Sequence, residues 1–315
     1  MNKKVVVVGS INLDLVAKVA RMPIEGETLT GTDFATYPGG KGGNQAVAAA
    51  RLGARVVMVG RLGEDHFAQQ LRSGLEEAGV GIECVLNVQK PSGSAVILVT
   101  AQGGNSIVVI PGANQSLTPG ELDKHIEELR GASVILSQLE IPMDTVEHMG
   151  ELANQLCVPF ILDPAPAQKL SRKMLNCVTW LTPNESETLS ILEHLEHSMP
   201  RALEEDDAIA SAAEFILSTG VRNVILKLGR RGIYLAGKDV PTTRIAPYRV
   251  MAVDTTAAGD AFNGGFAYGL THGMSPVESA QFACAVAAIS VTRSGAQPSM
   301  PSLVEVEALI ASVPV

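Results

Sequence analysis

Short apolar runs alternate with amphipathic stretches along most of this sequence, and this alternation constrains the fold more than any other feature. The runs include KVVVVG, RVVMVG, SVILSQLE, PFILDP, TWLTPN and NVILKLG. Between them, segments such as NQAVAAARLG, ELDKHIEELRG and MDTVEHMGELANQL repeat apolar residues at helical spacing. Strands that alternate with helices predict a doubly wound α/β fold, in which a mostly parallel sheet carries helices on both faces.

Two segments depart from this rhythm and predict a small antiparallel sheet. Residues 15–37 and 94–111 resemble antiparallel strands, and the second segment contains a GGN turn typical of a hairpin. A small sheet that stands off the main one is a natural lid over a site at the strand ends. We therefore expect residues 1–315 to form one α/β domain with a lid. We assign neither a single type of secondary structure nor a function to the charged segment 190–207.

The composition argues against nucleic-acid and membrane partners. Acidic residues outnumber basic ones by 33 to 24, the formal net charge is −9, and no basic run is longer than a pair. A broad footprint on a phosphate backbone is therefore not expected. The longest apolar run, FACAVAAI at 282–289, is too short to span a bilayer, and the valines after Lys4 are too few for a signal peptide. We expect a cytoplasmic protein.

The segment DTTAAGDAFNGGF (254–266) places small residues and an aspartate at the start of an apolar helix. The amides of Ala257, Ala258 and Gly259 can form an anion hole, and Asp260 can accept the proton of an attacking hydroxyl. One turn would then meet both needs of phosphoryl transfer. A helix N-terminus also lowers a carboxylate pKa, which predicts an ionised Asp260. The alternative is that Asp260 only stabilises the helix dipole.

Two segments in the first part of the chain predict contacts to a small polar ligand. PGGKGGNQ (38–45) places glycines around Lys41 ahead of a helix, which suits close approach to a hydroxylated or anionic ligand better than packing alone. Asn12 and Asp14 can point the same way toward vicinal hydroxyls, although the segment alone favours ordinary turn chemistry. Neither segment has the spacing of a Walker loop or of a dinucleotide fingerprint.

Further polar groups follow other predicted strands. Glu140 ends SVILSQLE and is either a ligand or a helix cap. Asn184 and Glu187 have the spacing of a capping box, but an amide and a carboxylate also suit a phosphate or hydrated Mg²⁺. The turn KLGRRG (227–232) can hold a nucleotide phosphate or be a solvated hairpin.

Taken together and in this order, a series of motifs resembles the ribokinase-like (PfkB) carbohydrate kinases. The resemblance extends from Lys4 to about Ala311, and its motifs are NLD, PGGKGGNQAVAAA, QLE, DPAPA, PNESE, KLGRRG, DTTAAGDAFNGGF and VTRSGAQPSMP. It implies that the chain transfers the γ-phosphoryl group of ATP to O5 of D-ribose, with Mg²⁺ required, K⁺ activating, and a homodimer formed through the lid. The main alternative is a kinase of the same fold for 2-deoxyribose, another small sugar or a nucleoside. A sugar sensor without catalysis would not need an intact Asp260 region, and a dehydrogenase would need the missing dinucleotide fingerprint.

The resemblance also implies a role for each matching residue. Asp260 corresponds to the catalytic base, with Ala257, Ala258 and Gly259 as the anion hole. The implied sugar-binding positions are Asn12, Asp14, Gly40, Lys41, Gly42, Gly43, Asn44, Glu140 and Asp260. The implied positions for ATP and Mg²⁺ are Asn184, Glu187, Lys227, Leu228, Gly229, Arg230, Arg231, Gly232, Gly259 and Cys284. The implied monovalent-cation positions are Asp254, Thr256, Ser290, Arg293, Gly295 and Ser299. Cys284 departs from the family, because histidine or asparagine often meets the adenine there.

Overall fold

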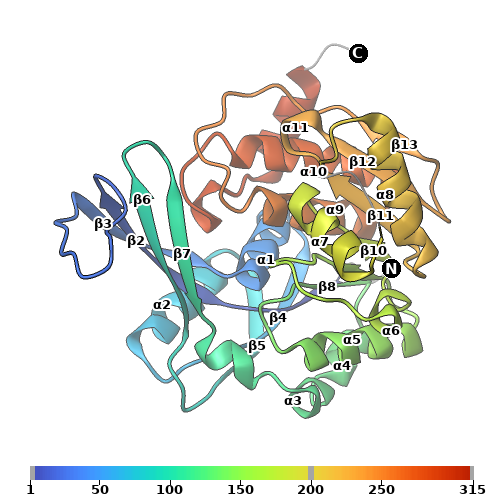
Figure 1. Cartoon of the computed structure of the whole chain (residues 1–315). Helices are drawn as coiled ribbons and strands as arrows, with labels where there is room; N and C mark the ends of the chain where they lie inside the picture. Colours follow the sequence, from blue (N-terminus) through green and yellow to red (C-terminus); the bar gives the residue numbers. More distant parts are fainter. Residues whose placement is uncertain (1–3, 198–201, 313–315) are drawn as a thin grey trace.

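A large sheet with helices on both faces dominates the computed structural model, which describes residues 4–197 and 202–312 (Figure 1). Across this nine-stranded sheet, the described strands follow the order β13 (Thr243–Ile245), β12 (Ile233–Gly237), β11 (Asn223–Lys227), β10 (Trp180–Leu181), β9 (Phe160–Leu162), β8 (Val134–Ser137), β1 (Lys4–Val8), β4 (Arg55–Leu62) and β5 (Val80–Asn87). In this order, each neighbouring pair of strands between β11 and β5 is parallel. At the other edge, β12 pairs antiparallel with both β11 and β13. The predicted doubly wound, mostly parallel sheet is confirmed.

Helices cover both faces of this sheet because successive strand residues point to opposite sides. Along β1, Val5 and Val7 belong to one buried core, whereas Val6 and Val8 belong to the other. The core on the Val5 side includes α1 (Lys41–Arg51), α2 (His66–Glu77), α9 (Ala258–Thr271), α10 (Pro276–Ser290) and α11 (Leu303–Ser312). The other core includes α3 (Pro119–Asp123), α4 (Ile126–Arg130), α5 (Met143–Gln155), α6 (Arg172–Leu175), α7 (Glu185–His194) and α8 (Asp206–Ser218). Within residues 4–197 and 202–312, no helix combines the length and apolarity needed to cross a membrane.

One predicted helix is divided in the structure. The segment ELDKHIEELRG forms α3 and α4 instead of one helix, because the amide of His125 bonds to the carbonyl of Leu122, only three residues back. In the uninterpreted segment 190–207, α7 ends at His194 and α8 begins at Asp206, and residues 198–201 lie outside the described part of the chain.

A four-stranded sheet stands off the large one (Figure 1). Its antiparallel pairs, β2 with β3 and β6 with β7, are joined by a parallel pairing of β2 with β6. Because β2 already begins at Asn12, Asn12 and Asp14 lie on one side of a strand rather than in a turn. The strands follow the order β3 (Asp33–Gly39), β2 (Asn12–Val19), β6 (Gly93–Thr100) and β7 (Asn105–Ile110).

The helices α1 and α9 approach each other closely at Gly264. A Cβ atom at Gly264 would lie 2.5 Å from Cβ of Ala48 and 2.9 Å from the amide nitrogen of Ala49. Gly264 lies about one helical turn after Asp260, and Ala48 lies about one turn after Asn44. The contact between the two helices therefore brings their N-terminal ends together.

We expect Gly264→Ala to lower the free energy of unfolding by about 1–3 kcal/mol, because the added methyl group overpacks this helix contact. Gly120→Ala is the matched control, since a Cβ at Gly120 in α3 would meet no heavy atom within 4 Å. The control should change the free energy by less than about 1 kcal/mol. Urea unfolding followed by circular dichroism measures both, and a Gly264→Ala protein as stable as the control would contradict the expectation.

Candidate active site

A cavity of about 690 Å³ lies at the carboxyl ends of the parallel strands and is lined in part by Asp260. Three of its lining residues come from neighbouring strands: Asp163 directly follows β9, Asn184 follows β10, and Lys227 ends β11. Ligands of open α/β sheets bind at this edge, and the volume is typical of sites for small molecules. The cavity is therefore the candidate active site.

The start of α9 presents backbone amides to this cavity. Ala257 adopts a left-handed conformation with φ 58°, and α9 begins at Ala258. Within the described part of the chain, the amide of Gly259 has no protein acceptor, whereas the amide of Ala258 bonds to the carbonyl of Thr255 at 3.3 Å. A Cβ at Gly259 would lie 3.2 Å from Nζ of Lys227. This helix end can therefore hold an anion beside the lysine.

Asp260 is held by two side-chain amides of α1. Asn44 Nδ2 donates to Oδ2 of Asp260 at 2.9 Å, and Gln45 Nε2 donates to Oδ1 at 3.0 Å. Burial raises the pKa of Asp260 to about 6, and Asp163 adds to this rise, whereas Lys41 and the two amides oppose it. The expected lowering of this pKa by the helix N-terminus is therefore wrong, because burial has the larger effect. Asp260 is a stronger base than an ordinary aspartate and is still mostly ionised at neutral pH.

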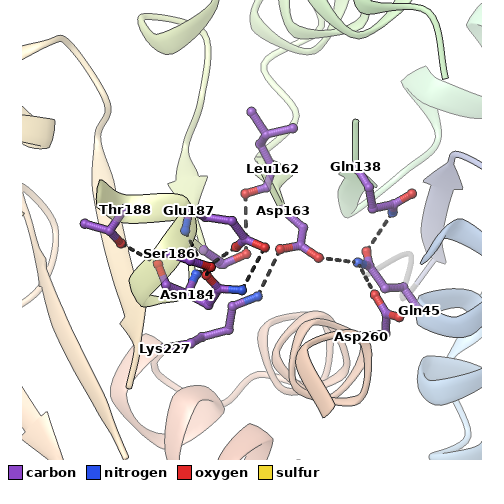
Figure 2. Close-up of polar contacts among 11 residues, drawn as sticks. Gln45, Gln138, Leu162, Asp163, Asn184, Ser186, Glu187, Thr188, Lys227 and Asp260 are labelled. Atoms are coloured by element: carbon purple, nitrogen blue, oxygen red, sulfur yellow. Dashed lines mark hydrogen bonds and ion pairs between the residues drawn. The ribbon is translucent and has the colours of Figure 1, made fainter. Parts of the chain in front are cut away.

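A second buried carboxylate, Asp163, connects Asp260 to Lys227. Nζ of Lys227 lies 2.9 Å from Oδ1 of Asp163, and Gln45 Nε2 donates to Oδ2 of Asp163 at 3.0 Å (Figure 2). Asp163 is 2% exposed. Sequence reasoning did not assign a role to Asp163 or Gln45, although both lie within the motifs DPAPA and PGGKGGNQ. Their contact joins segments far apart in the sequence and could not be inferred from spacing.

Lys41 in the first turn of α1 supplies positive charge to this centre. Burial disfavours its ammonium form, but the attraction of Asp260, Asp163, Glu140 and Glu187 raises the pKa of Lys41 above its usual value. Lys41 therefore stays charged at neutral pH and offsets part of the surrounding negative charge.

Asp14 and Glu140 belong to the same electrostatic centre. Burial, followed by repulsion from Glu140 and Asp260, raises the pKa of Asp14 to about 7, and Lys41 opposes this rise. Glu140 accepts hydrogen bonds from the hydroxyl of Ser10 at 2.5 Å and from the amide of Lys41 at 3.1 Å. Glu140 is therefore a cap of α1 that also faces the ionisable groups of the site.

The glycine-rich segment packs tightly against residues 10–12, where β2 begins, with Gly40 just before α1 and Gly42 in its first turn. Gly40 has a φ of 81°, and a Cβ there would lie 2.6 Å from the amide nitrogen of Asn12. A Cβ at Gly42 would lie 2.7 Å from the amide nitrogen of Ser10. Oδ1 of Asn12 accepts a hydrogen bond from Asn114 at 2.7 Å. The structure thus gathers at one end of α1 the predicted sugar-side residues Asn12, Asp14, Gly40, Lys41, Gly42, Gly43, Asn44 and Glu140.

Asn184 and Glu187 form a capping box and also line the cavity. Oδ1 of Asn184 accepts from the amide of Glu187, and Oε2 of Glu187 accepts from the amide of Asn184, both at 2.8 Å (Figure 2). Burial raises the pKa of Glu187, and Lys227 opposes the rise. The pair therefore caps α7 and also lies at the cavity, where the alternative interpretation expects a phosphate or hydrated Mg²⁺.

The KLGRRG turn contributes only some of its residues to the cavity. Lys227, Gly229, Arg230 and Gly232 line it, and part of the turn is the 3-10 helix η2 (Gly229–Arg231). Leu228 is buried in the core, and Arg231 is paired with Glu185 and donates to the carbonyls of Leu203 and Glu204. Cys284 lines the cavity, and burial raises the pKa of its thiol to about 12, so it is neutral. Sequence reasoning missed the apolar walls Pro247, Tyr248, Val250, Ala287, Ala288 and Val291.

The segment around Asp254 and the segment that follows α10 lie side by side and contain the predicted cation-binding residues. Asp254 accepts hydrogen bonds from the amides of Thr256 and Gly295, both at 2.9 Å. Its own amide donates to the carbonyl of Val291 at 3.1 Å. Arg293 forms an ion pair with Glu305. The buried hydroxyls of Ser290 and Ser299 bond to the carbonyls of Ala287 and Ala296.

Comparisons with known proteins give a consistent result. The family model described as pfkB family carbohydrate kinase matches residues 2–303. The chain is 37% identical to a ribokinase of Bacillus subtilis, over 98% of this chain and 99% of the relative. It is also 37% identical to a deoxyribokinase of Salmonella typhimurium, over 95% of this chain and 96% of the relative. The structure of Arabidopsis thaliana ribokinase complexed with ribose and ATP superposes with a TM-score of 0.91 at 34% identity, covering 98% of this chain and 99% of that one.

We expect Asp260→Asn to fold and to gain stability relative to the wild type as the pH rises. A folded pKa of about 6 means that the wild type loses stability as the pH rises from the unfolded pKa through about 6. Asparagine has no such loss, so the difference in unfolding free energy should grow by about 2 kcal/mol between about pH 4.5 and about pH 8. Urea unfolding at both pH values measures it, with the exposed Glu77→Gln on α2 as control. A difference independent of pH would contradict the raised pKa.

Proposed function

Because the chain belongs to the pfkB family of carbohydrate kinases, we propose that it transfers the γ-phosphoryl group of ATP to O5 of D-ribose. It is an ATP-dependent sugar kinase, and D-ribose is the acceptor that its relatives support best. The observation that carries the proposal is Asp260, a buried carboxylate of raised pKa at the start of α9, in a cavity beside two lysines. ATP as the donor also supports a cytoplasmic location.

Asp260 is the proposed general base. Asn44 and Gln45 hold both of its oxygens, so the carboxylate is oriented before a sugar binds. The proton of the O5 hydroxyl would pass to Asp260 as the oxygen attacks the γ-phosphorus and the bond to the β-phosphate oxygen breaks. The proposed sugar contacts come from Asn12, Asp14, Gly40, Lys41, Gly42, Gly43, Asn44 and Glu140.

The proposed anion hole is the turn from Ala257 to Gly259. The amide of Gly259, which has no acceptor within the described residues, supports this role, as does Lys227 beside it. Phosphoryl transfer depends mainly on position and on charge stabilisation, and fixed amides supply both without reorganisation. The proposed nucleotide contacts also include Gly229, Arg230, Gly232 and Cys284.

Mg²⁺ fits the charge of this site. The buried carboxylates outnumber the two lysines, and oxygen is the ligand that Mg²⁺ prefers. Among the residues that the structure describes, no group of three or more acidic, histidine or cysteine side chains is placed to enclose a metal. We propose that Asn184 and Glu187 hold Mg²⁺ through water, as this ion usually keeps several waters. When bound, the ion would neutralise phosphate charge.

The paired loops around Asp254 and Gly295 are the proposed K⁺ site. Hydrogen bonds from Thr256 and Gly295 outweigh burial and lower the pKa of Asp254, so a fixed negative charge is available there. The same loop continues into the anion hole, where the carbonyl of Thr255 accepts from Ala258. The proposed ligands are backbone carbonyls and side chains among Asp254, Thr256, Ser290, Arg293, Gly295 and Ser299. When bound, K⁺ would stabilise the loop that precedes the anion hole.

We also propose that residues 1–315 act as one domain and that the small sheet forms a homodimer interface. Strand β7 at its edge is exposed along its whole length. Ile107, Val108, Val109 and Ile110 are 53%, 62%, 44% and 40% exposed, and such an apolar edge usually meets a partner.

A kinase for 2-deoxyribose is the second candidate. Its support is specific, because the identity to the Salmonella deoxyribokinase equals the identity to the Bacillus ribokinase. The two sugars differ by one hydroxyl, and a site that binds this hydroxyl can discriminate strongly against the sugar that lacks it.

We expect D-ribose to give the highest kcat/KM when ADP release is measured with MgATP against D-ribose, 2-deoxyribose, fructose and adenosine. Replacing Na⁺ by K⁺ should raise the rate with D-ribose. If 2-deoxyribose has the higher kcat/KM, the second candidate is correct. If no sugar is phosphorylated, the proposed function is wrong.

We expect Asp260→Asn to lower kcat by about 10²–10⁴-fold, because the proton acceptor is lost while the anion hole is kept. The dissociation constant for D-ribose, measured by calorimetry, should change much less than kcat. The control Glu77→Gln should retain wild-type kcat. Near-normal turnover by Asp260→Asn would refute the assignment of the base.

We expect the wild type to be a dimer and the double variant Ile107→Glu/Val109→Glu to be a monomer in analytical ultracentrifugation. Charges on the exposed β7 strand oppose burial of this edge. The matched control is Val304→Glu on α11, which is 74% exposed and lies outside the small sheet. A monomeric wild type, or a double variant that remains a dimer, would exclude this interface.

A further inference from the structure

The side chain of Gln45 joins the two buried carboxylates of the site through one amide group. Its Nε2 donates to Oδ1 of Asp260 and to Oδ2 of Asp163, each at 3.0 Å (Figure 2). Gln45 is 1% exposed, so water does not compete for these bonds. A side-chain amide has two N–H donors, and here each donor is used by a different carboxylate.

The orientation of this amide is determined by its surroundings. Oε1 of Gln45 accepts a hydrogen bond from Nε2 of Gln138 at 2.7 Å, and Gln138 is completely buried. If Gln45 were turned over, its oxygen would face two carboxylates and its NH₂ would face the NH₂ of Gln138. A Cβ at Gly9 would lie 2.2 Å from Oε1 of Gln138, so a glycine at this position leaves room for the second amide.

From this geometry we propose that Gln45 is a positioning residue that holds Asp260 and Asp163 in a fixed arrangement for phosphoryl transfer. The inference rests on the proposed function and adds to it a residue that acts through Asp260 and Asp163 and not on the substrate. A continuous path of hydrogen bonds and an ion pair runs from Lys227 through Asp163 and Gln45 to Asp260. Gln45 thereby links the lysine beside the anion hole to the proposed base.

Gln45 also reduces the repulsion between the neighbouring carboxylates of Asp163 and Asp260, because it donates a hydrogen bond to each. Asp163 raises the pKa of Asp260, whereas the bond from Gln45 lowers it. Without the two donors, the carboxylates would repel each other with no group between them, and Asp260 would hold its proton to higher pH.

The test uses two substitutions at Gln45 and one control. Gln45→Met keeps the length of the side chain but removes both donors. Gln45→Glu keeps the shape but places a third carboxylate between the other two. The control is Asn223→Leu at the opposite end of β11 from Lys227, where a fully buried amide donates to Asp239 at 3.2 Å and to the carbonyl of Thr179 at 3.1 Å.

We expect the acid limb of the kcat/KM profile to move up by about one pH unit in Gln45→Met, and further in Gln45→Glu. At about pH 6 this shift corresponds to a roughly fivefold lower kcat/KM for Gln45→Met, which should recover in part at about pH 8. The affinity for D-ribose should change little. Asn223→Leu should keep the wild-type pH profile even if it is less stable.

If Gln45 had only a packing role, its substitution would lower stability and leave the acid limb of the kcat/KM profile unchanged. This outcome would overturn the inference. Urea unfolding tests the same shift in the pKa of Asp260 without measuring enzyme activity. The stability deficit of Gln45→Met should grow between about pH 5 and about pH 8, because its Asp260 ionises at higher pH in the folded state, whereas that of Asn223→Leu should stay constant. A wild type that phosphorylates no sugar refutes the proposed function, and a constant deficit in Gln45→Met refutes the role of Gln45. If Gln45→Met does not fold, an unchanged profile or deficit in Gln45→Glu overturns the inference equally.

Discussion

The close contact between α1 and α9 is the constraint on which the site depends. Gly264 allows the helices to approach so closely that its missing Cβ would lie 2.5 Å from Cβ of Ala48. About one turn earlier on each helix, the same approach brings Asn44 and Gln45 to the two oxygens of Asp260. A larger residue at Gly264 would separate the helices and lengthen both hydrogen bonds. The packing of α1 against α9 in the core therefore also determines the orientation of the proposed base.

The charge of the site follows from its position at the ends of several buried strands. Asp163, Asn184 and Lys227 lie at or after the ends of three neighbouring strands and line the cavity. Burial raises the pKa values of Asp14, Glu187 and Asp260, and the excess of carboxylates raises that of Lys41. The proposed Mg²⁺ would add positive charge to this centre when an anionic nucleotide binds.

Much of the fold and part of the site could be predicted from the sequence, because they depend on local patterns. Alternating runs such as KVVVVG gave the sheet, and the small residues before Asp260 indicated free amides at a helix end. The proposed role of Gln45 was not predictable, because it depends on Asp163, which lies more than one hundred residues away along the chain. The pKa of Asp260 was predicted in the wrong direction, because the helix end is visible in the sequence but the depth of burial is not. The sequence also did not show that Arg231 pairs with Glu185 instead of lining the cavity, because this ion pair forms only in the folded chain.

Several residues that allowed either a structural or a functional interpretation form helix caps in the structure and also lie at the candidate active site. Glu140 caps α1 and faces Lys41, and Asn184 with Glu187 caps α7 while lining the cavity. A carboxylate that accepts a backbone N–H is held in one rotamer, so it loses little conformational entropy when a ligand binds. Capping therefore prepares these groups for binding. A capping pattern at the carboxyl end of a buried strand is consequently compatible with the binding roles proposed for Glu140, Asn184 and Glu187.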